Sequence, residues 1–115
     1  MRVTAGEFRG RVLCENKYEH IRPTADMVKQ AIFNKLQDRI VGARVLDLFC
    51  GTGALGIEAV SRGAGKVIFV DKDYRSVELT KANLKKLGIV AKVVKASYEQ
   101  AIKSLAGQKF DIIII

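Results

Sequence analysis

Residues 45–56, VLDLFCGTGALG, decide the fold of this chain. The mostly apolar residues 45–48 predict a short buried strand, the next residues form a turn with two closely spaced glycines, Gly51 and Gly53, and residues 54–60 open a helix. Glycine lets a backbone turn sharply and lets a ligand approach it closely. A strand, a glycine-rich turn and a helix therefore predict the first half of a βαβ unit that binds a nucleotide-like ligand.

The acidic residue in this stretch bears on which ligand is bound. The spacing Gly51-x-Gly53-x-x-Gly56 also fits the dinucleotide fingerprint. Asp47, however, ends the predicted strand, where a carboxylate would repel a pyrophosphate and would suit a ligand with a cationic amino group, such as S-adenosylmethionine. Two alternatives stay open: a dinucleotide site, and a plain strand–turn–helix in which Asp47 only caps the helix.

A second strand is predicted over residues 66–71, KVIFVD, which are apolar almost throughout, as in a parallel strand that is covered on both faces. It ends on Asp71, twenty residues after Gly51. A carboxylate at this position can accept both hydrogen bonds from a ribose. We therefore predict Asp71, with its neighbour Lys72, in the cofactor site, and assign capping of the next helix to Asp73.

The remaining segments predict an alternating α/β chain. A helix is expected from about residue 24 to residue 40, with an apolar stripe of Val28, Ile32, Leu36 and Ile40 facing the core and Lys29 on the polar side. Further helices are expected over residues 74–87 and 97–105, and strands over 91–95 and 110–115. Residues 1–4 and 11–13 fit a small hairpin.

Three segments together resemble a known family: MRVTAGEFRGRVL, RPTADMVKQAIFNKL and VLDLFCGTGALGIEAVSRGA. They are similar to the bacterial 16S ribosomal RNA guanine-N2 methyltransferases, along the N-terminal part of that family's length. Asp47, Phe49, Gly51 and Gly53 match motif I of class I methyltransferases, D/E-x-F-x-G-x-G. The resemblance implies a Rossmann-like fold with parallel strands in the order 3-2-1-4, truncated after strand 4, with S-adenosylmethionine as cofactor and a guanine N2 amine as methyl acceptor.

The resemblance also implies roles for residues that follow the third and fourth strands. Ala96 and Ser97 occupy the turn that packs against adenine in the family, although the usual acidic residue is missing here. The family's catalytic Asn/Asp-Pro-Pro-aromatic motif after strand 4 is absent from this sequence. We therefore name no catalytic residue and no metal site, and expect the 115-residue chain alone to be inactive and its open strand 4 edge to promote self-association.

The charge of the chain points to a polyanionic partner. The net charge is +8 and the isoelectric point is about 9.7. We predict a basic N-terminal arm or hairpin over residues 1–22, ahead of the cofactor-binding part at 23–115, with Arg2, Arg9, Arg11 and Arg22 contacting phosphates of ribosomal RNA or the small ribosomal subunit. The alternatives are a flexible, solvated arm and, for the whole chain, a non-catalytic RNA-binding domain or a dinucleotide-dependent oxidoreductase.

The composition also narrows the cellular setting. The sequence has no apolar run long enough to cross a membrane, and the first residues lack the apolar segment of a signal peptide. The two cysteines, Cys14 and Cys50, do not form a C-x-x-C pair. These features predict a reduced, cytoplasmic protein without membrane attachment.

Overall fold

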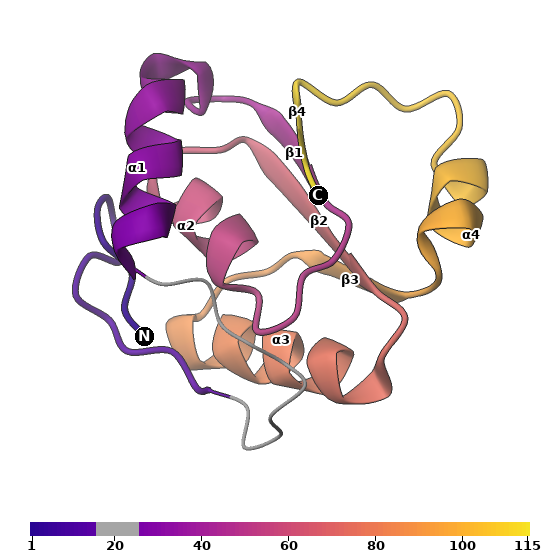
Figure 1. Cartoon of the computed structure of the whole chain (residues 1–115), viewed down its shortest axis with the longest axis horizontal. Helices are drawn as coiled ribbons and strands as arrows, with labels where there is room; N and C mark the ends of the chain where they lie inside the picture. Colours follow the sequence, from indigo (N-terminus) through magenta and orange to yellow (C-terminus); the bar gives the residue numbers. More distant parts are fainter. Residues whose placement is uncertain (16–25) are drawn as a thin grey trace.

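A four-stranded parallel sheet forms the centre of the computed structural model, which describes residues 1–15 and 26–115. The strands lie in the order β3-β2-β1-β4, which confirms the predicted α/β class and strand order (Figure 1). Their bounds are β1 Arg44–Asp47, β2 Lys66–Asp71, β3 Lys92–Lys95 and β4 Ile112–Ile114. The first strand begins and ends one residue earlier than its sequence predicts.

Helices precede and connect these strands. They are α1 Asp26–Leu36, α2 Ala54–Ser61, α3 Tyr74–Leu87 and α4 Tyr98–Ser104, and the short 3₁₀ helix η1 Gln37–Arg39 follows α1. Asp73 caps α3 by accepting a hydrogen bond from the amide of Arg75 at 2.8 Å, as predicted. Ser97 and Gln100 form a capping box at the start of α4. None of the helices in the described part is long and apolar enough to cross a bilayer.

The sheet is covered on both faces, which explains why β2 is apolar almost throughout. Val67 and Phe69 of β2 belong to a core that includes residues of α1, α2 and α3, whereas Ile68 and Val70 belong to a second core with α4. Figure 1 shows α4 set apart from the other three helices, across the sheet. A β-strand alternates its side chains between faces, so a central strand needs apolar residues at every position.

One glycine allows α2 to pack closely against the sheet. A Cβ added at Gly56 would lie 2.3 Å from a ring carbon of Phe69 on β2. Such a contact is not possible without displacement of a buried ring, so the third glycine of the Gly-x-Gly-x-x-Gly pattern serves helix–strand packing.

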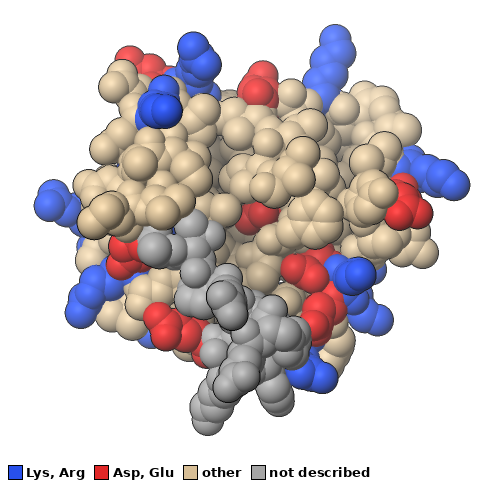
Figure 2. All heavy atoms as spheres, viewed as in Figure 1, with Lys and Arg blue, Asp and Glu red and all other residues tan. Residues whose placement is uncertain are grey.

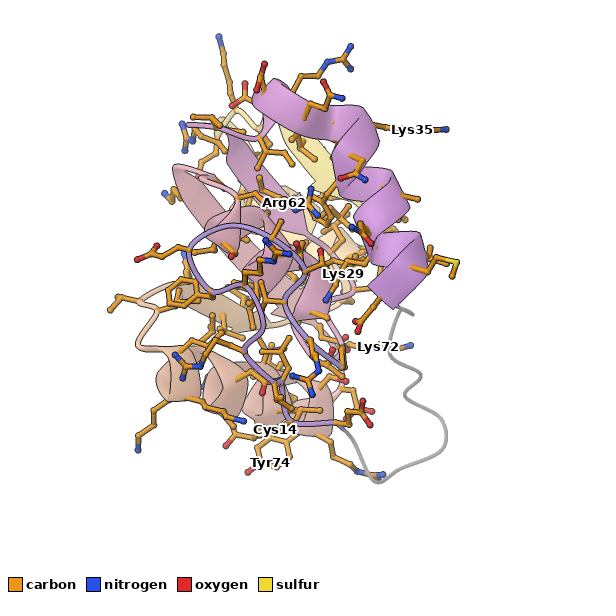
Figure 3. All side chains as sticks on the ribbon, turned by 90° about the vertical axis from the view of Figure 1, so that its left-hand side faces the viewer. Cys14, Lys29, Lys35, Arg62, Lys72 and Tyr74 are labelled. Carbon is orange, nitrogen blue, oxygen red and sulfur yellow. The ribbon has the colours of Figure 1, made fainter. Side chains whose placement is uncertain are left out.

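The register of α1 differs from the prediction. Val28 and Ile32, expected in the core, are 52% and 41% exposed, and the buried residues of the helix are Lys29 and Phe33. The predicted inward stripe is therefore wrong for these two positions, although Ile40 is buried as expected. Figure 3 shows Lys35 pointing outward from α1, whereas Lys29 points toward the interior.

The physical reason for this register is a buried ion cluster. The Lys29 ammonium lies 3.4 Å from a carboxylate oxygen of Glu58, and both side chains are fully buried. Glu58 also pairs with Arg62 at 2.8 Å and accepts hydrogen bonds from the Thr4 amide and hydroxyl at 2.9 and 2.7 Å. Burial alone raises the pKa of Glu58, but these partners and the charge of Lys29 hold it below its usual value. A buried lysine that is paired with a carboxylate thus occupies an inward position of α1 where an apolar side chain was expected.

Residues 1–13 form a hairpin that is docked on α2, whereas the predicted arm over residues 1–22 extends beyond the described residues. Its two sides are joined by an antiparallel bridge between Arg2 and Val12, and Val3 and Leu13 are buried in the core shared with α1, α2 and α3. The Ser61 hydroxyl at the end of α2 donates to the carbonyl of Ala5 at 2.6 Å and accepts from the Phe8 amide at 2.9 Å. Residues 1–15 are therefore packed against the domain rather than forming a freely solvated arm.

Candidate functional site

The candidate site begins at the turn between β1 and α2. Gly51 and Gly53 both have positive φ, 55° and 86°, a conformation that favours glycine. The Cys50 amide donates to the carbonyl of Val70 at 2.9 Å, which attaches the turn to β2. A Cβ at Gly53 would lie 3.0 Å from the Thr80 methyl group, a tight contact that adds to the positive φ in favouring glycine at this position.

Two buried polar residues of α3 hold the carbonyls of this turn. The Thr80 hydroxyl donates to the carbonyl of Gly51 at 3.0 Å, and the Asn83 amide donates to the carbonyl of Thr52 at 2.8 Å. Both side chains are fully buried. The sequence analysis missed them because their partners are about thirty residues away; the only available signal was two polar residues on the inward face of an amphipathic helix.

Asp71 lies beside the turn, at the carboxyl end of β2. Its Oδ2 accepts from the Gly51 amide at 3.0 Å, and its Oδ1 accepts from the Asp73 amide at 2.9 Å. Both oxygens are thus oriented by backbone amides while the side chain remains partly exposed. Each carboxylate oxygen has more than one acceptor site, so further hydrogen bonds from a ligand remain available.

Asp47 is much more deeply buried, with 1% of its surface exposed. Its Oδ2 accepts from the Gly56 amide at 3.1 Å, in the first turn of α2. Burial raises the pKa of Asp47 to about 7; the Gly56 hydrogen bond opposes this shift, and the nearby charge of Asp71 adds to it. The helix-capping role that the sequence left open is therefore present in the structure. Contact with a ligand amino group stays a prediction.

A small cavity lies at the carboxyl ends of the strands; its lining does not include Asp47, Gly51, Gly53 or Asp71. It has a volume of about 190 Å³ and brings together four predicted site residues, Phe49, Lys72, Ala96 and Ser97. The rest of its lining comes from Leu48, Tyr98 and Glu99, which the sequence analysis did not single out. The rings of Phe49 and Tyr98 lie 6.2 Å apart, centre to centre, which is within the range of an aromatic pair.

A larger, open groove lies at the other end of the sheet. Its volume is about 700 Å³, and Lys85 and Lys92 at the end of α3 and the start of β3 are among its lining residues. Ligands of open parallel sheets bind outside the carboxyl ends of the strands. The smaller cavity beside the glycine turn is therefore the better candidate for the cofactor.

Three of the four predicted RNA-binding arginines lie on the hairpin and do not line this cavity. Arg2, Arg9 and Arg11 are exposed, whereas Arg22 lies outside the described residues. The guanidinium groups of Arg2 and Arg11 donate to the carbonyls of Gly10 and Lys86, each at 3.3 Å. On the face drawn in Figure 2, lysines and arginines lie around the rim rather than in one patch.

Comparison with known proteins agrees with the predicted resemblance. The ribosomal RNA small subunit methyltransferase D of Haemophilus influenzae is 43% identical over 101 residues, which covers 88% of this chain and 49% of that protein. A Bacillus subtilis protein named "Putative rRNA methyltransferase YlbH" is 44% identical over 108 residues, with 92% and 59% covered. The chain thus spans about half to three-fifths of the length of these relatives.

Solved structures show the same fold. The Escherichia coli protein "Putative methyltransferase yhhF" has a TM-score of 0.83 and 34% identity, covering 98% of this chain and 61% of that one. A protein called "SMU.776, a putative methyltransferase complexed with SAH" has a TM-score of 0.66 and 26% identity, with 79% and 26% covered. Over its full length, residues 1–115, the chain matches the family described as Conserved hypothetical protein 95. The chain therefore belongs to that family, in agreement with its resemblance to bacterial ribosomal RNA methyltransferases.

Proposed function

We propose that this chain forms the cofactor-binding half of an S-adenosylmethionine-dependent methyltransferase acting on the N2 amine of a guanine in small-subunit ribosomal RNA. The observation that carries the proposal is the pair Gly51 and Asp71: a glycine turn and an oriented carboxylate meet at the carboxyl ends of β1 and β2, the end of the sheet at which Phe49 and Lys72 line a cavity. The names of the relatives support the reaction and the ribosomal RNA substrate. Guanine N2 as the acceptor rests on the sequence resemblance.

Each predicted residue has a distinct part in holding the cofactor. Asp71 accepts hydrogen bonds from the ribose hydroxyls, because its oxygens are already oriented by backbone amides. Phe49, Ala96 and Ser97 pack against the adenine, and Lys72 borders the same cavity. Asp47 contributes its negative charge toward the amino group from beneath the turn that contains Gly51 and Gly53.

The chemistry requires positioning rather than covalent work by the protein. S-adenosylmethionine supplies an activated methyl group on a sulfonium. The protein therefore has to hold the donor and a neutral acceptor nitrogen in line, which is catalysis by orientation. The described residues of this chain supply the donor side of that arrangement. A guanine in structured RNA must be turned out of its stack to reach it.

The hairpin arginines Arg2, Arg9 and Arg11, together with Arg22, would contact RNA phosphates and so bind without reading sequence. The partner would be ribosomal RNA or the small ribosomal subunit, in the cytoplasm.

Copies of the chain would associate through β4, because Ile113 is 53% exposed and β4 pairs only with β1 within the described part of the chain. Light scattering at several protein concentrations tests this, and a monomer throughout would contradict it.

Isothermal calorimetry with S-adenosylhomocysteine, NAD and a ribosomal RNA fragment tests the proposal against both alternatives. We expect saturable heat with S-adenosylhomocysteine and none with NAD. Binding of NAD alone would favour the oxidoreductase. Binding of RNA without either small molecule would favour the non-catalytic RNA-binding domain.

A further inference from the structure

Asn83 of α3 makes contact with two separate parts of the molecule. It is fully buried, and its side chain makes three hydrogen bonds. Its Oδ1 accepts from the Cys14 amide at 2.6 Å, and its Nδ2 donates to the Cys14 carbonyl at 3.1 Å and to the Thr52 carbonyl at 2.8 Å. Figure 3 shows Cys14 next to α3. One side chain therefore ties the hairpin segment to the glycine turn.

The Thr52 end of this connection lies inside the candidate cofactor site. Thr52 stands between Gly51, whose amide is bound by Asp71, and Gly53. Its own hydroxyl accepts from the Ala54 amide at 3.3 Å and lies 3.8 Å from the sulfur of Met1 in the hairpin. A shift of the turn would therefore move groups that also contact the N-terminal segment.

At Cys14, the Asn83 side chain bonds to the backbone as a neighbouring β-strand would. Asn83 satisfies both the amide and the carbonyl of this residue, which otherwise requires a backbone partner. The side-chain amide of Asn83 can hydrogen-bond to Cys14 and to Thr52 at the same time only while both residues lie in their present positions. If either moves, a buried polar group loses its partner, which is unfavourable.

We propose that Asn83 is a positioning residue that couples occupancy of the cofactor site to docking of the N-terminal hairpin. This inference rests on the proposed function, since it assumes that an S-adenosyl ligand binds at the turn. A ligand that fixes the turn fixes Asn83, and through it Cys14. Coupling between two sites is reciprocal, so a hairpin held in place by RNA phosphates would in turn strengthen cofactor binding.

Ser61 offers a matched control. Its hydroxyl also makes two hydrogen bonds to the hairpin, to Ala5 and Phe8, but it lies at the far end of α2 from the glycine turn. Ser61→Ala therefore loosens the hairpin without touching Thr52. Asn83→Ala removes both connections, and Asn83→Asp keeps the acceptor for the Cys14 amide while losing the donor for the carbonyls of Cys14 and Thr52.

Amide hydrogen exchange, measured with and without saturating S-adenosylhomocysteine, tests the coupling. The reporters are the amides of Val3 and Leu13, which bond within the hairpin to the carbonyls of Arg11 and Met1 and not to Asn83. In the parent chain and in Ser61→Ala, we expect the ligand to slow their exchange on the order of tenfold, within the range of typical coupled sites. In both Asn83 variants the ratio of rates should fall to near one, whatever their rates without ligand.

Two results would overturn the coupling. One is seen in the parent chain alone: the ligand slows hydrogen exchange at the amides of Gly51 and Gly53 but not at those of Val3 and Leu13. The other is an unchanged ratio in a folded Asn83 variant. If the ligand gives neither slowed turn amides nor calorimetric heat with the parent chain, the proposed function itself fails, which is a distinguishable outcome.

Discussion

The Asp71 carboxylate accepts a hydrogen bond from the Gly51 amide at 3.0 Å, so the end of β2 is joined directly to the turn that follows β1. The two residues are twenty positions apart: Asp71 is the last residue of β2, and Gly51 lies in the turn after the adjacent parallel strand β1. This contact brings a carboxylate and a glycine backbone together at the carboxyl ends of two central strands, which is where nucleotide-like ligands bind in folds of this kind.

Removing the Asp71 carboxylate should weaken cofactor binding. Asp71→Ala is expected to cost about 1.5–3 kcal/mol of S-adenosylhomocysteine binding, the range for hydrogen bonds to a charged group. Asp111→Ala is the matched control, because Asp111 also accepts a backbone amide, that of Arg44 at 2.8 Å, but at the opposite end of the sheet. Calorimetry on both variants measures the difference. Equal S-adenosylhomocysteine affinities for the two folded variants would show that Asp71 does not contact the cofactor.

Cofactor affinity should depend on pH near neutrality if Asp47 faces the amino group. Burial raises the pKa of Asp47 to about 7, so the side chain is mostly protonated below that pH and mostly charged above it. Only the charged form attracts an ammonium group. The affinity for S-adenosylhomocysteine should therefore rise as pH increases through about 7 and fall as pH decreases.

The control for this dependence is Asp47→Asn, which cannot ionise. Its affinity should vary less across the same interval. Calorimetry at about pH 6, 7 and 8 makes the comparison. A parent chain whose affinity is flat, or which loses affinity as pH rises, would argue that Asp47 acts only as the cap of α2.

The buried cluster around Glu58 should be sensitive to the loss of one of its charged partners. Lys29→Met keeps most of the side-chain length but removes the ammonium from fully buried Glu58, and removal of one partner of a buried ion pair costs about 3–5 kcal/mol. Lys35→Met on the exposed side of α1 is the matched control. Urea unfolding of both variants provides the measurement. A loss no larger for Lys29→Met than for Lys35→Met would show that Arg62 and Thr4 satisfy Glu58 on their own.

The hairpin arginines should contribute to RNA binding through charge. Replacing Arg9 and Arg11 with glutamate should weaken binding across RNA sequences and reduce the slope of log affinity against log salt by roughly one unit per lost phosphate contact. The control is the double variant Lys103→Glu, Lys109→Glu, which changes the net charge by the same amount but near α4 and β4. Filter binding at several salt concentrations compares them. An equal effect of the two double variants would indicate a dependence on total charge alone.

The sequence predicted those features that depend on residues close together in the chain. The glycine turn, the position of Asp71 and the cap at Asp73 all follow from short spacings. The inward face of α1 did not, because Lys29 is buried by its pairing with Glu58, which lies on a different helix. A hydrophobic pattern cannot anticipate a buried charge that is paired in this way.

Asn83 and Thr80 escaped prediction for a related reason. Their polar side chains look ordinary within a helix, and only the tertiary arrangement reveals that both bond to the glycine turn. The docking of the hairpin on Ser61 also depends on residues more than fifty positions apart. Such contacts are a property of the assembled fold rather than of any local segment.

The most direct test of the central claim is a two-dimensional ¹H–¹⁵N NMR titration of the chain with S-adenosylhomocysteine. The account predicts saturable shift changes concentrated at the turn and cavity, in the amides of Gly51, Gly53, Lys72, Ala96 and Ser97. Shift changes confined to the groove at the other end of the sheet, around Val90 and Lys92, or no changes at all, would contradict it.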